Sequence, residues 1–252
     1  LGLFGRIPAA TLQLYGFCDK MTQNSKMKSA VILAAGLSSR MMDFKPLLPF
    51  GGTTVIQHTV SRMLEGGAEE IILVTGFLAT EVERIFRDSR VRFVHNRDYA
   101  KSQMFDSVCL GLAAARGDEI FLLPADLPQI DPTLLNRLSA IPAQAVYPVC
   151  HGKNGHPLLL RRSGVETVLL HDGTQGLKGA LERLDTQTIE TEDLGCLLDI
   201  DNPEDYQKLL DFRAESVPTE WECQELLQFF GTSERTQAHC EAVCRVAVKL
   251  AD

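Results

Sequence analysis

Short apolar runs alternate with amphipathic stretches from about residue 30 onward, a pattern typical of βαβ units. The pattern predicts strands at 30–35, 69–77, 91–96 and 119–128, and helices at 54–67, 80–86 and 106–115. The predicted strands are apolar along their whole length, which indicates a sheet covered by helices on both faces. We therefore expect a three-layer α/β/α, Rossmann-like fold with a mixed, mostly parallel sheet.

The second half of the chain is less regular. It predicts strands at 144–150 and 156–162, a helix at 176–184 and a strand end at 197–201. Asn202 is a predicted N-cap, and Pro203 the first residue of a helix that reaches about Phe212. Beyond residue 214 only helical stretches follow. We expect three parts, namely a leader of unclear status at 1–27, a domain at 28–213 and a helical segment at 214–252.

Composition narrows the class of protein. The 252 residues are 45% hydrophobic and 23% charged, as in a soluble globular protein. The formal net charge of −8 argues against a nucleic-acid partner, and no apolar run is long enough to cross a bilayer. The seven cysteines are scattered, odd in number and without a Cys-x-x-Cys pair, which favours reduced thiols and a cytoplasmic protein.

The stretch VILAAGLSSRMMDFKPLLPFGG, residues 31–52, leaves a predicted strand through a glycine turn. Such a turn puts the following loop at the carboxyl edge of the sheet, where ligands of open α/β folds bind. Small residues let a ring or a phosphate approach the backbone, and the hydroxyls and cations beyond them suit phosphate oxygens. The candidate residues are Leu33, Ala34, Ala35, Gly36, Ser38, Ser39, Arg40 and Lys45. Taken alone, an ordinary turn followed by two surface cations explains the stretch as well.

The order L-A-A-G-x-S-x-R-M, K-x-L-L-P and then a glycine resembles the signature of a nucleotidyltransferase family with a GT-A-like fold. This MobA/MocA-like family includes the molybdenum cofactor guanylyl- and cytidylyltransferases, and the match looks closest to the cytidylyltransferase branch. The resemblance covers roughly residues 28–213 and continues in LPADLP, NGHP and DIDNPEDY. Met42 departs from it, because most relatives have a glycine there.

The resemblance implies a nucleotide-binding role for the loop. In the family, the loop holds a nucleoside triphosphate, and its Arg and Lys, here Arg40 and Lys45, stabilise charge as pyrophosphate leaves. Ala35 stands where the guanylyl branch usually has glycine, which favours CTP. Ser107 lies where relatives place a serine that contacts the nucleotide, and Ser102 is a weaker candidate.

Gly76 ends a predicted strand beside the same edge. It is a candidate wall of the base pocket, although a simple turn explains it equally well.

Two carboxylates are candidate ligands for Mg²⁺. Asp126 follows the apolar run IFLLP and is therefore predicted at the carboxyl edge, where it would suit a cation that takes few protein ligands. Turn formation before Pro128 is the alternative for Asp126. Asp201 matches the family's second metal carboxylate, and alternation along 197–201 would put Asp199 on the same face. Helix N-terminal electrostatics ahead of Pro203 is the alternative for both.

The resemblance implies transfer of CMP from CTP to a phosphate-bearing acceptor, with molybdopterin as the nearest choice and His156 on the acceptor side. A sugar or polyol phosphate is an alternative acceptor. A nucleotide-sensing module that regulates a fused helical domain is an alternative of another class. The stretch around His239 resembles the first helix of an HD-type phosphohydrolase domain, and a chance amphipathic helix explains it equally.

Overall fold

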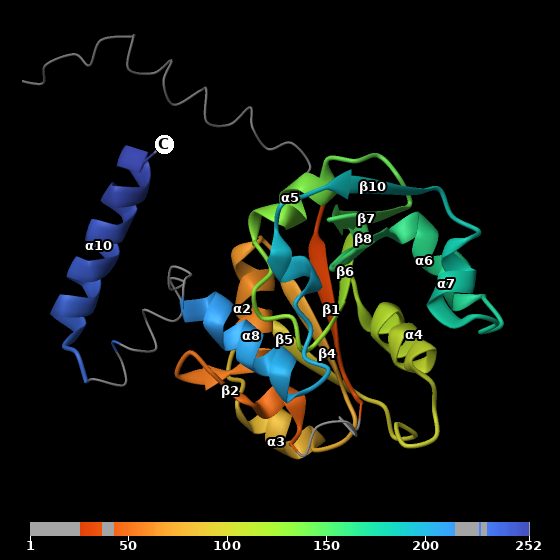
Figure 1. The fold of residues 1–252 in the computed structure, drawn as a ribbon, viewed down its shortest axis with the longest axis horizontal. Coiled ribbons are helices and arrows are strands. Elements are labelled where there is room, and N and C mark those ends of the chain that lie inside the picture. The colour runs from red at the N-terminus through yellow and green to blue at the C-terminus, as the bar shows by residue number, and fades with distance from the viewer. Residues whose placement is uncertain (1–25, 37–42, 215–226, 228–230, 252) are drawn as a thin grey trace, which may run out of the picture.

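The computed structural model describes residues 26–36, 43–214, 227 and 231–251. Its main feature is a mixed sheet of eight strands in the order β10-β7-β9-β6-β1-β4-β5, with β8 paired to β7 (Figure 1). The strands are β1 (Lys28–Ala34), β4 (Glu70–Thr75), β5 (Val91–His95), β6 (Glu119–Pro124), β7 (Ala145–Cys150), β8 (Lys153–Asn154), β9 (Leu158–Arg161) and β10 (Thr186–Glu190). A separate hairpin joins β2 (Pro49–Phe50) to β3 (Thr53–Thr54).

Helices lie between these strands and after the last of them. They are α2 (Val55–Glu65), α3 (Ala79–Arg84), α4 (Met104–Ala114), α5 (Thr133–Ser139), α6 (Arg162–Leu169), α7 (Gly176–Leu181), α8 (Pro203–Ala214) and α10 (Glu234–Ala251), with 3-10 helices at Lys45–Leu47 and Leu194–Leu197. The strands β6, β1, β4 and β5 run parallel to one another, whereas β9 is antiparallel to both β6 and β7. The sheet is therefore mixed and mostly parallel, as predicted.

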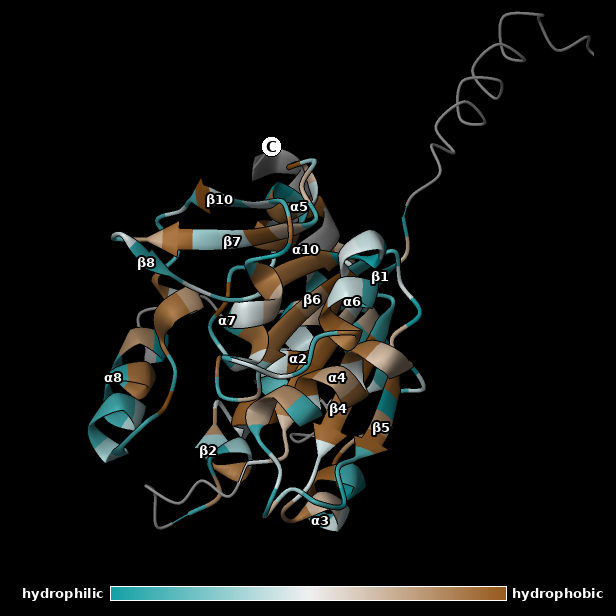
Figure 2. Cartoon of the chain, turned by 90° about the vertical axis from the view of Figure 1, so that its right-hand side faces the viewer, coloured by the Kyte–Doolittle hydropathy of each residue, from teal (hydrophilic) through white to brown (hydrophobic). Residues whose placement is uncertain are grey.

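The core forms two layers of side chains, one on each face of the sheet. Alternate residues of β1 point to opposite faces, so that Ile32 packs with α2, α3 and α5, while Val31 packs with α4, α6 and α7. The apolar residues gather on the central strands and on the helix faces turned toward them (Figure 2). This arrangement confirms the three-layer α/β/α fold.

A smaller cluster holds α8 against the hairpin and α2. It consists of Leu48, Phe50, Val55, Ile200 and Leu209. The hydroxyl of Tyr206 on α8 also donates a hydrogen bond to the carbonyl oxygen of Pro49. These contacts hold the segment before α8 beside Leu48 and the β2–β3 hairpin.

The predicted strand end at 197–201 is wrong. The Asp193 side chain accepts a hydrogen bond from the Gly195 backbone N–H at 2.9 Å and begins a 3-10 helix, Leu194–Leu197, which an irregular segment follows. Alternation along a strand therefore does not set the positions of Asp199 and Asp201. The predicted cap is confirmed, because Asn202 Oδ1 accepts from the Asp205 N–H at 2.9 Å.

Several elements of the second half were not predicted, among them α5, β8, α6 and β10. The edge strand β10 reads TQTIE, which is mostly polar and exposed, and α6 directly follows β9 without a loop. The helical prediction for the last segment agrees with α10, and its resemblance to an HD-type domain stays a prediction. Among the described residues, no helix is both long and apolar enough to cross a membrane.

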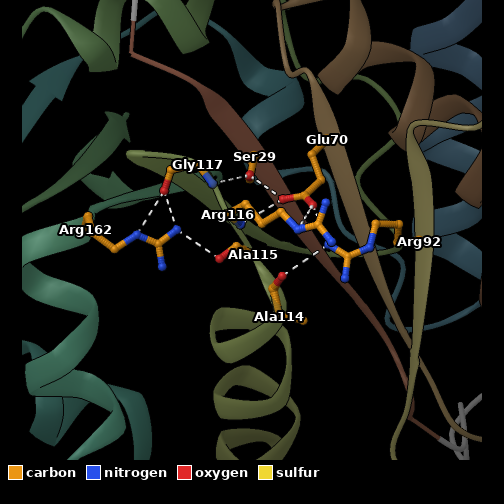
Figure 3. A network of polar contacts seen from close by, with 8 residues as sticks. All are labelled: Ser29, Glu70, Arg92, Ala114, Ala115, Arg116, Gly117 and Arg162. Atoms are coloured by element: carbon orange, nitrogen blue, oxygen red, sulfur yellow. Dashed lines mark hydrogen bonds and ion pairs between the residues drawn. The ribbon is translucent and has the colours of Figure 1, made fainter.

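The amino edge of the sheet is tied together by Glu70, which is 5% exposed. Its carboxylate accepts from Ser29 Oγ at 2.8 Å, from Arg92 Nη1 at 2.5 Å and from the Arg116 N–H at 2.9 Å (Figure 3). Burial by itself raises the pKa of Glu70, but these hydrogen bonds and the Arg92 charge outweigh it, and the net pKa is lowered. The carboxylate therefore stabilises the folded state in its charged form.

Glu70→Gln is expected to lower the free energy of unfolding by about 1–3 kcal/mol at neutral pH, because an amide cannot accept all three hydrogen bonds. The native pKa lies below the unfolded value, so this stabilisation is present above the unfolded pKa and is lost as pH falls through the native pKa. Urea unfolding of both proteins at neutral and acid pH measures the difference.

Glu69→Gln is the matched control, since it removes the same charge from an exposed neighbour. Its effect should stay within about 0.5 kcal/mol. A difference between wild type and Glu70→Gln that persists unchanged in acid would contradict the role assigned to the Glu70 carboxylate.

Candidate functional site

A cavity of about 290 Å³ opens at the carboxyl edge of the sheet. Its walls come from the end of β1, the 3-10 helix that begins at Lys45, the segment between β5 and α4, and the end of β6. The lining residues are Leu33, Ala34, Ala35, Gly36, Lys45, Pro46, Tyr99, Ser102, Gln103, Met104, Ser107, Pro124, Ala125 and Asp126. Most of the predicted nucleotide-binding residues that the structure describes therefore meet in one cavity.

The end of β1 provides a wall almost free of side chains. Ala34 and Ala35 are buried, and Gly36 is exposed. No atom of the described residues lies within 4 Å of the position that a Cβ on Gly36 would take. A planar ring or a phosphate can therefore approach the backbone closely here.

Gly76 supports this wall from behind and is not one of the lining residues. A Cβ at Gly76 would lie 2.7 Å from the Ala35 carbonyl oxygen and 2.7 Å from the Tyr99 Cβ. The ends of β1 and β4 approach each other so closely that only glycine fits between them. Because both nearby groups are held by the backbone, a rotamer change cannot relieve the clash.

Lys45 brings the two predicted metal carboxylates together. Its Nζ lies 3.6 Å from Asp126 Oδ2 and 3.2 Å from Asp201 Oδ1. The Lys45 and Asp126 side chains are 13% and 17% exposed, whereas Asp201 is 53% exposed. Asp126 lies 81 residues after Lys45 in the chain, and Asp201 lies a further 75 residues on. Both carboxylates nevertheless lie beside the Lys45 ammonium group.

Asp126 follows β6 and lies in a largely desolvated position. Burial raises the pKa of its carboxyl group, the nearby charge of Lys45 opposes that rise, and the charge of Asp199 adds to it. Burial and the charge of Asp201 also raise the pKa of Asp199. Carboxylates that repel one another in this way favour a cation between them.

The donor set fits Mg²⁺. Among the residues that the structure describes, no group of three or more His, Cys, Asp or Glu side chains is arranged to hold a metal ion by itself. Asp126 and Asp201 supply carboxylate oxygens around a position that a cation, the Lys45 ammonium, already approaches. Mg²⁺ is commonly bound by one or two carboxylates together with substrate phosphates and waters, so a pair is sufficient.

His156 does not line the cavity, although it lies just before β9, the strand that pairs with β6. Continuing the β6–β9 register beyond Leu122↔Leu158 puts His156 opposite Pro124. Its N–H donates to the Cys196 carbonyl at 2.9 Å, and burial lowers the pKa of its imidazole, opposed by a hydrogen bond to the Leu122 backbone. Burial therefore favours the neutral imidazole at this position next to the end of β6.

Three predicted residues, Ser38, Ser39 and Arg40, lie outside the described residues, and so does Met42. Their predicted roles stay predictions.

Several lining residues were missed by sequence reasoning. Tyr99 and Gln103 come from the loop between β5 and α4, and Met104 is the first residue of α4, where neither periodicity nor a strand end signals a cavity. The one available signal was the polar stretch YAKSQ immediately before the helix that carries Ser107.

The family model for the MobA-like NTP transferase domain matches residues 30–188, which is more than half of the chain. This chain belongs to the MobA-like NTP transferase family.

Relatives of this MobA-like chain are nucleotidyltransferases. The molybdenum cofactor cytidylyltransferase of Escherichia coli strain K12 is 30% identical to it over 178 residues, which are 70% of this chain and 92% of that protein. A nucleotidyl transferase from Methanothermobacter thermautotroptrophicus is 29% identical, has a TM-score of 0.64 and is matched over 74% of this chain and 97% of its own. The MobA-like chain is accordingly a nucleotidyltransferase enzyme.

A further solved structure, Rv0371c from Mycobacterium tuberculosis H37Rv, is 25% identical with a TM-score of 0.64, over 74% of this chain and 99% of its own. That protein has also been solved in complex with manganese.

Gly76→Ala is expected to destabilise the MobA-like chain by about 1–3 kcal/mol, because the added methyl group meets the Ala35 backbone. The matched control is Gly36→Ala, which should change stability by less than about 0.5 kcal/mol, since its methyl group enters the cavity. Chemical denaturation of both variants measures the difference. Equal stabilities would contradict the close approach of β1 and β4.

Proposed function

We propose that this nucleotidyltransferase transfers CMP from CTP to a phosphate-bearing acceptor and releases pyrophosphate, with a molybdopterin as the acceptor. The observation that carries the proposal is the convergence of Lys45, Asp126 and Asp201 beside a cavity whose β1 wall is nearly free of side chains. Cationic and metal-binding groups beside an open backbone suit a triphosphate.

The reaction needs no protein nucleophile. An oxygen of the acceptor phosphate attacks the α-phosphorus of CTP and forms a new P–O bond. The bond from the α-phosphorus to the oxygen that bridges to the β-phosphate breaks, and pyrophosphate leaves with the electron pair. Catalysis by the protein therefore consists of positioning the two phosphates and stabilising negative charge.

Asp126 and Asp201 would hold Mg²⁺, which supplies charge neutralisation at the phosphate oxygens. Lys45 reaches both carboxylates, so its ammonium is also within reach of a phosphate held beside them. By resemblance to the family, Arg40 adds a second cation, and Ser38 and Ser39 add hydroxyl donors. Catalysis rather than sensing is favoured because nucleotide binding alone does not require the paired carboxylates.

The nucleotide preference is assigned from Ala35 in the β1 wall and from the E. coli relative, whose name is that of a cytidylyltransferase. Ser107 contacts the nucleotide in this proposal, while Gly76 shapes the wall behind it. His156, held neutral next to the end of β6, contributes to the acceptor side. An HD-type domain around His239 is a proposed fused or separate partner.

Purified protein with CTP, Mg²⁺ and molybdopterin should release pyrophosphate, which a coupled assay measures. Asp126→Asn and Lys45→Met should each lower kcat by about 100-fold or more, because Lys45 stabilises negative charge on the transferring phosphate and Asp126 would hold the Mg²⁺ that does the same. The control Asp211→Asn removes an exposed carboxylate of α8 and should leave activity unchanged. Full activity in Asp126→Asn would remove that residue from the proposed metal site.

CTP with Mg²⁺ should raise the melting temperature more than GTP, UTP or ATP at equal concentration, because a ligand that binds only the native state stabilises it. Gly36→Ala should reduce this shift without lowering the melting temperature of the free protein. Preferential stabilisation by GTP would overturn the assignment drawn from Ala35.

A further inference from the structure

Asn96 lies directly after β5, against the loop that forms one wall of the cavity. Its side chain is buried, with 4% of the residue exposed, and its backbone N–H donates to the Thr75 carbonyl at 2.8 Å. It does not line the cavity itself. Any influence of Asn96 on a ligand therefore acts through its neighbours.

The orientation of the Asn96 amide is fixed by a backbone group. The Asp98 N–H donates to Asn96 Oδ1 at 3.1 Å. Because a backbone N–H can only donate, the oxygen of the amide must face Asp98 and the NH₂ group must point the other way. There, Asn96 Nδ2 lies 2.9 Å from Ser102 Oγ and 2.9 Å from Ser107 Oγ.

Both hydrogens of this NH₂ group are thus used on serine oxygens. Each serine accepts a hydrogen bond from Asn96, and its own proton cannot point back toward that donor. Ser102 and Ser107 both line the cavity. A single buried amide therefore leaves two hydroxyl protons available to donate to a ligand in the cavity.

We infer that Asn96 is a positioning residue that selects a base edge made of hydrogen-bond acceptors, by holding Ser102 and Ser107 as donors. Cytosine has such an edge, since its O2 and N3 both accept. Uracil has an N–H at position 3, which offers no acceptor to the second hydroxyl proton. The inference rests on the proposed function and adds the group that separates CTP from UTP.

The test exchanges the donor for an acceptor of nearly the same shape. In Asn96→Asp the carboxylate accepts from the two serines, so their protons turn away from the cavity. The Kd for CTP with Mg²⁺, measured by isothermal titration calorimetry, should rise by about tenfold or more, as the loss of one to two hydrogen bonds predicts. The Kd for UTP should change by less than about threefold, so that the preference for CTP over UTP falls.

Gln144→Glu is the matched control. The Gln144 side-chain oxygen accepts from the Asp185 N–H at 3.1 Å, as Asn96 Oδ1 does from Asp98, but Gln144 precedes β7 at the opposite edge of the sheet. Its Kd ratio between CTP and UTP should equal that of wild type. Steady-state kinetics add a second readout, because Asn96→Asp should raise KM for CTP while kcat changes little.

If Asn96→Asp does not fold, the double variant Ser102→Ala and Ser107→Ala removes the same donors from the cavity and should lower the CTP preference alike. Equal weakening of CTP and UTP in the folded variant, or an unchanged ratio, would overturn the role of Asn96 while leaving wild-type CTP binding and the proposed function in place. Failure of wild type to bind CTP would instead overturn the proposed function.

Discussion

The ammonium group of Lys45 is the point on which the site depends, because it compensates two carboxylates from distant parts of the chain. Asp126 arrives at the end of a buried central strand, and Asp201 arrives from the irregular segment before α8. Burial raises the pKa values of Asp126 and Asp199, and the charge of Asp199 adds to the rise for Asp126 as that of Asp201 does for Asp199. A group of negative charges so close together favours a cation, and the proposed transfer of a nucleotidyl group would use that cation at the phosphate oxygens.

The amino edge of the sheet contributes to stability, and the carboxyl edge carries the candidate functional site. At the amino edge, Glu70 is fully enclosed by hydrogen-bond donors and joins β1, β4, β5 and the end of α4 (Figure 3). At the carboxyl edge, β1 leads into Ala35 and Gly36 and β6 leads into Asp126, and these residues line a cavity. Satisfied polar groups hold one end rigid, so the other end can keep groups oriented toward a ligand.

Small residues and buried amides act together at the cavity wall. Gly76 allows the end of β4 to approach the Ala35 backbone, which forms part of the cavity wall. Asn96, whose N–H donates to the Thr75 carbonyl beside this glycine, directs the hydroxyls of Ser102 in the next loop and Ser107 in α4. Residues that do not line the cavity thus determine both its shape and the direction of its hydrogen-bond donors.

The sequence by itself determined the central strands, the end of β1 ahead of Gly36 and the position of Asp126 after β6, because a continuous apolar run that stops at small or polar residues marks where a buried strand ends. It also indicated Lys45 and Asp201 by resemblance, but it predicted a strand around Asp199 where Asp193 instead starts a 3-10 helix. Only the tertiary structure decided how Asp201 reaches Lys45, through the apolar cluster that joins Ile200 and Leu209 to the hairpin and α2, and how Asn96 orients two serines. Such contacts join residues far apart in sequence, and they depend on packing that local periodicity does not encode.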